Sequence, residues 1–323
     1  MRGLVFRGSR NLFTVRAEEP GGLGPELECR IKGKVLKGRE GYYNPLAPGD
    51  WVTLEAGPDG TARILAAGEW RNLLTRFNQK GQKPQILAAN LDLLLCVTSP
   101  LSPPFRPRFL DRVLVQAEAA GIPAAILCNK YDLAPSPENR GAPAEQGVEE
   151  RLGDYRRAGY RVLRVSAKTG WGLDELRALG AGKTTALLGQ SGVGKSSLIR
   201  ALAPGLTIKT GAMNEKYDRG THTTTLSVMR EIGIPPVPGG PEIPSRIIDT
   251  PGIRRMVPDG VKPEDLILYM REFAPLAGRC AYGLSCSHRG EPGCRITEAL
   301  AAGTIHEDRY ESFLRIGDEL AAL

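Results

Sequence analysis

The chain has 323 residues, 41% of them hydrophobic, which is the composition of a globular protein with room for two or three domains. It contains no run of eighteen apolar residues, and its N-terminus has no apolar segment followed by a small-residue cleavage site. Both observations argue against a membrane span and a secretory signal, so we expect a cytoplasmic protein without a membrane partner and, by default, a monomer.

The net charge of +7 is unevenly distributed. Residues 1–90 carry fourteen Lys and Arg against nine Asp and Glu, and residues 71–83 contain four basic residues and no acidic one. A basic surface attracts polyphosphate through counterion release, so this part of the chain is a candidate nucleic-acid interface. The alternative is an ordinary solvated basic face.

Three regions differ in their expected elements. Residues 1–70 form short alternating β segments separated by Pro/Gly turns, which predict a small β-barrel, most simply a five-stranded OB-type barrel. From residue 91 onward, apolar strands alternate with helices, as in a mostly parallel sheet covered on both faces. The strands are expected at 91–99, 123–128, 160–167, 184–189, 226–232 and 246–252, with helices near 108–120, near 145–158 and from residue 195.

After residue 252 the strands stop. Residues 262–276 and 296–323 are expected to be helical, with a cysteine-rich segment between them. We therefore predict three domains, at 1–75, 76–256 and 257–323.

A phosphate-binding motif opens the helix that starts at Lys195. Its fixed positions are Gly189, Gly194, Lys195 and Ser196, and it follows an apolar strand, as a P-loop requires. Glycines let backbone N–H groups approach phosphates, Lys195 is expected to reach the β- and γ-phosphates during catalysis, and the Ser196 hydroxyl is expected to hold Mg²⁺. The loop residues Gln190, Ser191, Gly192, Val193 and Ser197 are expected to line the nucleotide.

Two further motifs have the chemistry that reads a guanine base. Asn129-Lys130-Tyr131-Asp132 ends one apolar strand, and Ser166-Ala167-Lys168 ends the next. An Asp132 carboxylate would accept two hydrogen bonds from guanine, a donor pair that adenine lacks. The Ala167 N–H would meet the guanine O6, while Asn129 and Lys130 would brace the base and the P-loop.

The segment 249–252 follows the last strand. Asp249 is expected to bind Mg²⁺ through water, and the Gly252 N–H is expected to contact the γ-phosphate. In the preceding loop, 219–225, either Thr223 or Thr224 should complete the Mg²⁺ shell, and we take Thr224 as the candidate.

Ile253 follows the segment at a position where many GTPases have a water-orienting Gln, so intrinsic hydrolysis should be slow. His222 is a candidate catalytic group in its place; the alternative is a surface-loop histidine.

The order of these motifs is unusual. The base-reading motif precedes the P-loop by about sixty residues, whereas conventional GTPases begin with the P-loop. The same order results if the two ends of a conventional GTPase domain are joined and the chain is opened between the segment 249–252 and the motif 129–132. A circular permutation keeps every strand-end loop at the same edge of the sheet, so a nucleotide site survives it.

A final cluster has the composition of a metal site. Cys280, Cys286, His288 and Cys294 offer three thiolates and one imidazole, which suit one structural Zn²⁺ with tetrahedral coordination. In a cytosolic chain such spacing favours a metal over disulfides, and free thiols are the alternative.

Together these motifs resemble the RsgA family of small ribosomal subunit biogenesis GTPases, which are circularly permuted and depend on the ribosome. The resemblance extends over nearly the whole chain and includes "APGDWV", "RNLLTR", "CNKYDL", "GQSGVGKSSLI", "THTTT", "DTPG" and "CSHRGEPGC". It implies an OB barrel, a permuted GTPase domain and a zinc-binding helical domain. It also implies binding to the small subunit's rRNA late in maturation, with GTP hydrolysed to GDP when the subunit stimulates it. The family usually has four residues between the first two cysteines, and this chain has five.

Two other functions fit the motifs. One is a GTPase that acts on another RNA, such as tRNA or mRNA. The other is an RNA-binding scaffold that uses GTP only as a structural ligand.

Overall fold

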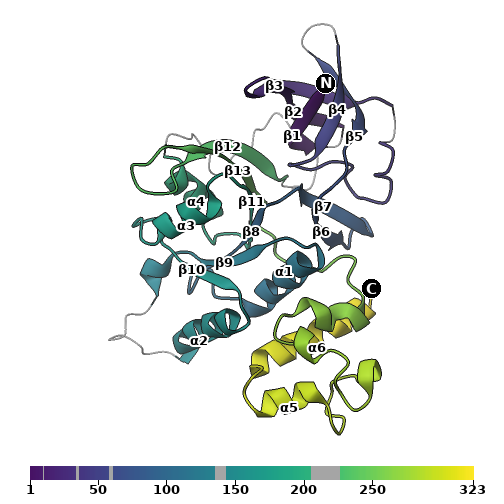
Figure 1. The fold of residues 1–323 in the computed structure, drawn as a ribbon, viewed down its shortest axis with the longest axis vertical. Helices are drawn as coiled ribbons and strands as arrows, with labels where there is room; N and C mark the ends of the chain where they lie inside the picture. The colour runs from purple at the N-terminus through teal and green to yellow at the C-terminus, as the bar shows by residue number, and fades with distance from the viewer. Residues whose placement is uncertain (10, 34–35, 58–60, 135–142, 205–225) are drawn as a thin grey trace.

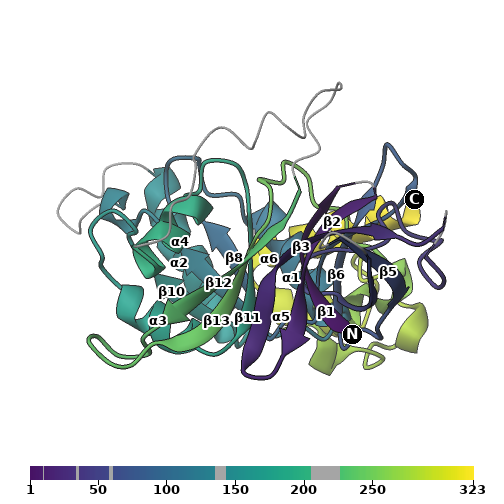
Figure 2. The ribbon, with the colours of Figure 1, turned by 90° about the horizontal axis from the view of Figure 1, so that it is seen from above.

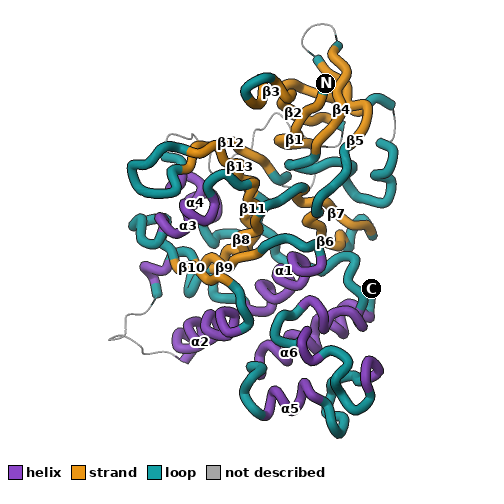
Figure 3. The backbone as a smooth tube through the Cα atoms, viewed as in Figure 1, coloured by secondary structure: helices purple, strands orange, loops and turns teal. Residues whose placement is uncertain are grey.

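The computed structural model describes the whole chain except residues 10, 34–35, 58–60, 135–142 and 205–225. Along its longest axis lie a β-barrel, a sheet covered by helices, and a C-terminal helical region (Figure 1). The same division is visible when the chain is coloured by secondary structure (Figure 3). Among the described residues, no helix combines the length and the apolarity needed to cross a bilayer.

The first five strands close into the expected barrel. Their order is β1-β2-β3-β5-β4, with β1 also paired to β4 and with β3 and β5 parallel. Alternating apolar side chains such as Val15, Val52 and Ile64 fill the interior, because successive residues of a strand point to opposite faces. The bounds are β1 Arg2–Ser9, β2 Leu12–Glu19, β3 Gly22–Ile31, β4 Trp51–Ala56 and β5 Ala62–Ala67.

A two-stranded hairpin, β6 (Leu73–Asn78) and β7 (Lys83–Ala89), joins the barrel to the sheet. Two of the basic residues of 71–83 bind within the chain, because Arg71 pairs with Asp92 at 2.7 Å and Arg76 donates to Gln85.

The central sheet has six strands in the order β10-β9-β8-β11-β13-β12. All neighbours are parallel except β12 and β13, which form an antiparallel edge. Strands β8 and β11 are buried along their whole length, as an interior parallel strand must be when helices cover both faces. The bounds are β8 Leu93–Thr98, β9 Ala124–Cys128, β10 Arg161–Arg164, β11 Thr184–Gly189, β12 Val228–Ile234 and β13 Ile243–Asp249.

Four helices cover the two faces of this sheet. Helices α1 (Pro107–Ala119) and α2 (Pro143–Arg157) pack on one face, and α3 (Leu173–Gly180) and α4 (Lys195–Leu202) pack on the other. Because β8, β9, β10, β11 and β13 run parallel, the loops that follow them all meet at one edge of the sheet.

The C-terminal region differs from its prediction in one segment. Residues 262–276 form short 3₁₀ turns rather than one α-helix. Pro275 lacks the N–H that would continue a helix, whereas Pro263 stands in the first turn, where a helix tolerates proline. The stacked rings of Phe273 and Phe313, with centroids 4.9 Å apart, lie in its core. The bounds are η4 Pro263–Tyr269, η5 Ala274–Leu276, η6 Gly283–Ser285, α5 Arg295–Ala301 and α6 Glu307–Ala321.

Helix α6 is attached to the sheet domain through a buried ion-pair cluster. The Arg309 guanidinium, 2% exposed, binds the carboxylates of Asp111 on α1 and Glu272. Burial disfavours the charge of Arg309, but Asp111 and Glu272 outweigh burial and hold its pKa well above the usual range. The domain contact is therefore specific, because removing one partner would leave the other charged and unpaired.

Candidate functional site

The phosphate loop, residues 189–196, connects β11 to α4. Gly194 has a φ of 93°, and a Cβ placed on it would lie 2.4 Å from the Asn129 Nδ2. Only glycine fits this position, both for its backbone conformation and for the space available. The N–H groups at the start of α4 are therefore free to face an anion.

The end of the phosphate loop contacts Asp249 at the end of β13. The Lys195 ammonium donates to the carbonyl oxygens of Gly189 at 3.0 Å and Gln190 at 3.1 Å, and the Ser196 hydroxyl donates to Asp249 Oδ2 at 3.1 Å. A hydroxyl and a carboxylate side by side are oxygen ligands of the kind that Mg²⁺ takes beside nucleotide phosphates, so the donor set fits this ion.

Burial disfavours both charges at this point. It lowers the pKa of Lys195, against the opposing effect of Asp249, and it raises the pKa of Asp249, against the opposing effects of Lys195 and Ser196. A phosphate beside Lys195 and a cation beside Asp249 would each favour the charged form of its neighbour. The site is thus electrostatically suited to a bound metal–phosphate pair.

The sensor loop, residues 249–252, packs directly on the phosphate loop. A Cβ on Gly252 would lie 2.7 Å from the Ser191 Cα, and the Ile253 N–H donates to the Gly189 carbonyl at 3.3 Å. Ile253 itself is 2% exposed, so its side chain belongs to the core. The sensor loop is therefore packed against the phosphate loop on one side and continues into the core on the other.

The Asn129 carboxamide joins three loops. Its Nδ2 donates to the Val193 carbonyl at 2.9 Å, and its Oδ1 accepts from the Ala167 N–H at 3.1 Å. Asn129 is 1% exposed, so these hydrogen bonds are shielded from water. These hydrogen bonds hold the phosphate loop and the two guanine-motif loops, residues 129–132 and 166–168, in one fixed arrangement.

Asp132 and Ser166 form the other contact between the guanine-motif loops. The Ser166 hydroxyl donates to Asp132 Oδ1 at 2.6 Å and accepts from the Thr169 N–H at 3.2 Å. Asp132 is exposed, so its second oxygen is available to a ligand. This arrangement orients the carboxylate at the same edge of the sheet as the phosphate loop.

The other expected nucleotide-lining residues differ in their surroundings. The Lys130 ammonium donates to the Ser102 carbonyl at 2.6 Å, and the Tyr131 ring stacks on Trp171 at 5.5 Å between centroids. Sequence reasoning missed Trp171, although an aromatic residue directly after "SAKTG" is a usable signal. Lys168, Ser191 and Gly192 lie exposed on the loops described, Ser197 is exposed in the first turn of α4, and Val193 is buried. The candidates His222, Thr223 and Thr224 lie outside the described residues.

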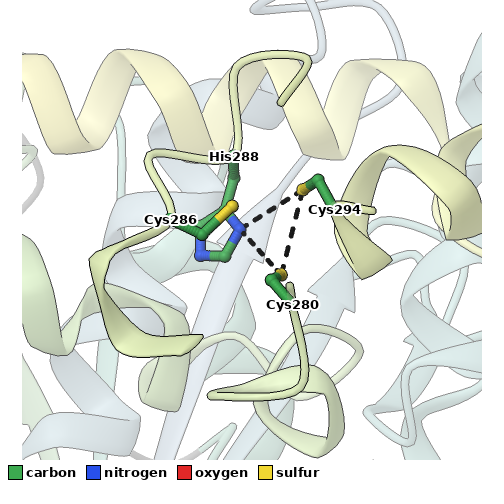
Figure 4. A group of neighbouring side chains, drawn as sticks. All are labelled: Cys280, Cys286, His288 and Cys294. Atoms are coloured by element: carbon green, nitrogen blue, oxygen red, sulfur yellow. Dashed lines mark hydrogen bonds between the residues drawn. The ribbon is translucent and has the colours of Figure 1, made fainter. Parts of the chain in front are cut away.

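The cysteine-rich segment forms a compact ligand set. The four ligand atoms of Cys280, Cys286, His288 and Cys294 lie within 4.8 Å of one another (Figure 4). The His288 Nδ1 is 3.5 Å from the sulfurs of Cys280 and Cys294, and those two sulfurs are 4.0 Å apart.

These separations suit a single tetrahedral ion, since Zn–S bonds of ~2.3 Å and Zn–N bonds of ~2.0 Å place neighbouring ligand atoms ~3.5–3.8 Å apart. All three cysteines are buried and free of disulfides. The cluster could therefore hold a zinc ion, and the five-residue spacing between its first two cysteines does not prevent convergence.

Supporting hydrogen bonds hold this cluster in place. The Tyr310 hydroxyl donates to the His288 carbonyl at 2.6 Å, and the Arg295 N–H donates to the Cys280 sulfur at 3.3 Å. Tyr310 is on α6, so the ligand set is anchored to the helix that contacts the sheet domain.

Comparisons with known proteins agree with this geometry. A model of the family described as RsgA GTPase matches residues 68–257. A protein of Bacteroides fragilis named "Small ribosomal subunit biogenesis GTPase RsgA" is 36% identical over 97% of this chain and 95% of its own length. One of the same name from Chlorobaculum parvum is 38% identical, covering 99% of this chain and 98% of its own.

Two solved structures are similar throughout. That of YjeQ from Thermotoga maritima has a TM-score of 0.70 and 29% identity, covering 100% of this chain and 99% of the other. That of YloQ, described as a circularly permuted GTPase, has a TM-score of 0.66 and 25% identity, covering 99% and 95%. The predicted permutation, the barrel and the enzyme class, a GTP hydrolase, are thus confirmed. The chain belongs to the RsgA family of GTPases.

Proposed function

We propose that this GTPase acts late in the maturation of the small ribosomal subunit, binds its rRNA, and hydrolyses GTP when the subunit stimulates it. The observation that carries the proposal is the union of the phosphate and guanine-motif loops through Asn129, in a chain that matches proteins named for this role along nearly its full length. We further propose that it acts as a monomer and in the cytoplasm, where small subunits mature.

Each of the three domains takes one part of this function. We assign RNA binding to the barrel, residues 1–75, nucleotide binding and hydrolysis to residues 76–256, and zinc binding to residues 257–323. The excess of basic residues in 1–90 supports the first assignment. The Arg2 guanidinium lies 4.0 Å from the centre of the half-exposed Trp51 ring, a pairing of cation and aromatic face that is also used on nucleic-acid surfaces.

Hydrolysis would depend on positioning and electrostatics. Lys195 neutralises β- and γ-phosphate charge, and the N–H groups of 190–196 cradle the phosphates. Ser196, Asp249 and Thr224 or Thr223 would hold Mg²⁺, which neutralises phosphate charge when bound. Because Ile253 is apolar and buried, it does not orient water, and we assign that role to His222.

Base selection would depend on Asp132, supported by Ser166. A carboxylate accepts both guanine donors. The Ala167 N–H expected at the guanine O6 donates to the Asn129 Oδ1 in this structure, so it would have to exchange that partner for the base. The bound zinc is structural, because four protein ligands leave no open position for a substrate.

The central experiment measures phosphate release with and without purified small subunits. We expect at least about tenfold stimulation, which corresponds to a barrier lowered by about 1.4 kcal/mol. Equal stimulation by unrelated RNA would favour a GTPase acting on tRNA or mRNA. An absence of turnover under every condition would instead favour a scaffold with GTP as a structural ligand.

Replacing Asp132 by Asn should weaken GDP binding by roughly 10–100-fold, because two charge-assisted hydrogen bonds to the base are lost. Xanthosine diphosphate should then bind better than GDP, since the new amide can donate to the additional oxygen of xanthine. Titration calorimetry with both nucleotides measures this. The control Asp174→Asn removes an exposed carboxylate that pairs with Arg177, and it should leave both affinities unchanged. Unaltered GDP binding in Asp132→Asn would contradict the assignment.

Metal analysis of the purified protein should give one zinc per chain. The variant Cys294→Ala should lose it, because three ligands rarely hold a closed structural site, and its melting temperature should fall. Cys96→Ala, a buried cysteine far from the cluster in sequence, should retain the zinc. Equal zinc content in both variants, or none in the unmodified protein, would overturn the assignment.

A further inference from the structure

A cavity of ≈ 580 Å³ lies where the phosphate loop, α1, the segment after the sensor loop and α6 meet. Gln190 of the phosphate loop forms one wall. Six of the lining residues are arginines: Arg106, Arg108, Arg112, Arg151, Arg254 and Arg255. The volume is within the range of sites that hold a ligand of about nucleotide size.

The acidic residues of the cavity are already paired. Glu319 accepts from Arg112 at 2.7 Å and Arg255 at 2.6 Å, and Glu311 binds both Arg108 and Arg315. The third acid, Asp308, lies 3.5 Å from the Arg151 Nε. The lining keeps an excess of three positive charges over the acids it contains.

Two of the arginines carry most of this excess. Arg106 and Arg254 are exposed, and neither side chain has an ion pair or hydrogen bond with any described residue. Both line the cavity together with Gln190 of the phosphate loop. An anion would therefore bind to these two guanidinium groups, which have no carboxylate partner among the described residues.

Arg151 contributes to the wall of the cavity on the side of α2. Its side chain is 5% exposed, and carboxylates of Asp111, Asp154 and Asp308 lie 3.5–3.8 Å from its nitrogens. Its charge is therefore compensated within the protein, and an anion would bind to the other arginines.

Two aromatic rings complete the lining. Phe105 and Phe109 are half-buried and flank Arg106 at the start of α1. Aromatic faces interleaved with arginines are the surface on which single-stranded nucleic acids stack their bases and place their phosphates. A small inorganic anion would use the arginines but not the rings.

The cavity is also linked to the sensor loop. Arg254 directly follows Ile253, whose N–H donates to the Gly189 carbonyl at the start of the phosphate loop. A ligand that holds the Arg254 guanidinium therefore acts on the backbone two residues from Gly252. Occupancy of the cavity and the position of the sensor loop should be coupled.

We propose that this cavity binds one nucleotide unit of a single RNA strand, with its phosphate on Arg106 and Arg254 and its base on Phe105 or Phe109. Binding there fixes the segment after the sensor loop and so conveys the presence of RNA to the nucleotide site. The inference rests on the proposed function, because it supplies the contact through which an RNA partner would stimulate hydrolysis.

The test uses the GDP-loaded, full-length protein and a hexaribonucleotide containing 4-thiouridine. After irradiation, mass spectrometry should find the crosslink in the peptide that contains Phe105 and Phe109. The double variant Arg106→Ala/Arg254→Ala should lose this crosslink while binding GDP normally. Loss of this phosphate contact should also lower the salt dependence of RNA binding, as a log–log slope, by roughly 0.7.

The matched control is Arg161→Ala/Arg177→Ala, which removes two arginines of the same domain that bind carboxylates on its surface. This variant should crosslink as the unmodified protein does. Crosslinks confined to the barrel, or unchanged in Arg106→Ala/Arg254→Ala, would overturn the inference. If free ATP suppresses the crosslink as well as unlabelled hexaribonucleotide does, the cavity binds a free nucleotide and the assignment to an RNA strand is overturned.

Turnover with small subunits separates this inference from the proposed function. If the subunit stimulates the unmodified protein and Arg106→Ala/Arg254→Ala equally, the cavity is not the contact and the proposed function stands. If the unmodified protein is not stimulated, the proposed function itself fails. We expect stimulation of the unmodified protein and its loss, by about tenfold, in the variant.

Discussion

One buried carboxamide determines whether the permuted chain has a nucleotide site. Asn129 donates to Val193 in the phosphate loop and accepts from Ala167 in the second guanine-motif loop, while its own loop follows β9. These three loops are widely separated in the chain and come from different strands, so parallel strand ends bring them near one another but do not fix their spacing. The planar carboxamide of Asn129 fixes the spacing of the loops. It is 1% exposed, so its donor and its acceptor must both find partners within the protein.

The permutation changes what the nucleotide site can control. The sensor loop leads directly into the C-terminal region, where Arg255 binds Glu319 of α6 only three residues after Gly252. On the other side, the barrel contacts β12, the strand that follows residues 219–225 in the chain (Figure 2). Arg16 of β2 binds Glu231 of β12 at 2.8 Å. Both appended domains thus contact segments that adjoin the nucleotide loops, as a protein that reports its nucleotide state to a large partner requires.

Sequence patterns predicted the features that depend on local chemistry. A short segment that binds a phosphate, a base or a metal needs particular residues at particular spacings. This is why sequence alone indicated the glycines of the phosphate loop, the motif around Asp132 and the spacing of Cys280 to Cys294. The order of motifs then predicted the permutation, because strand-end loops keep their place in a sheet whatever the order of the chain.

Features that depend on distant partners were not predictable in this way. The Arg309–Asp111 ion pair joins residues almost 200 positions apart, and no periodicity marks either partner. The cavity of arginines is likewise assembled from α1, α2, α6 and the segment after the sensor loop. In 262–276 the apolar spacing predicted one helix, but the chain forms separate 3₁₀ turns, and Pro275 lacks the N–H that would continue a helix.

The most direct test of this account is amide hydrogen exchange in the variant Asn129→Ala, compared with the unmodified protein. If one carboxamide holds the site together, exchange should accelerate in both 190–194 and 166–170, although neither segment is altered in sequence, and GDP should bind more weakly. Unchanged exchange in both segments, with GDP affinity retained, would contradict the account, because the loops would then be held by strand position alone.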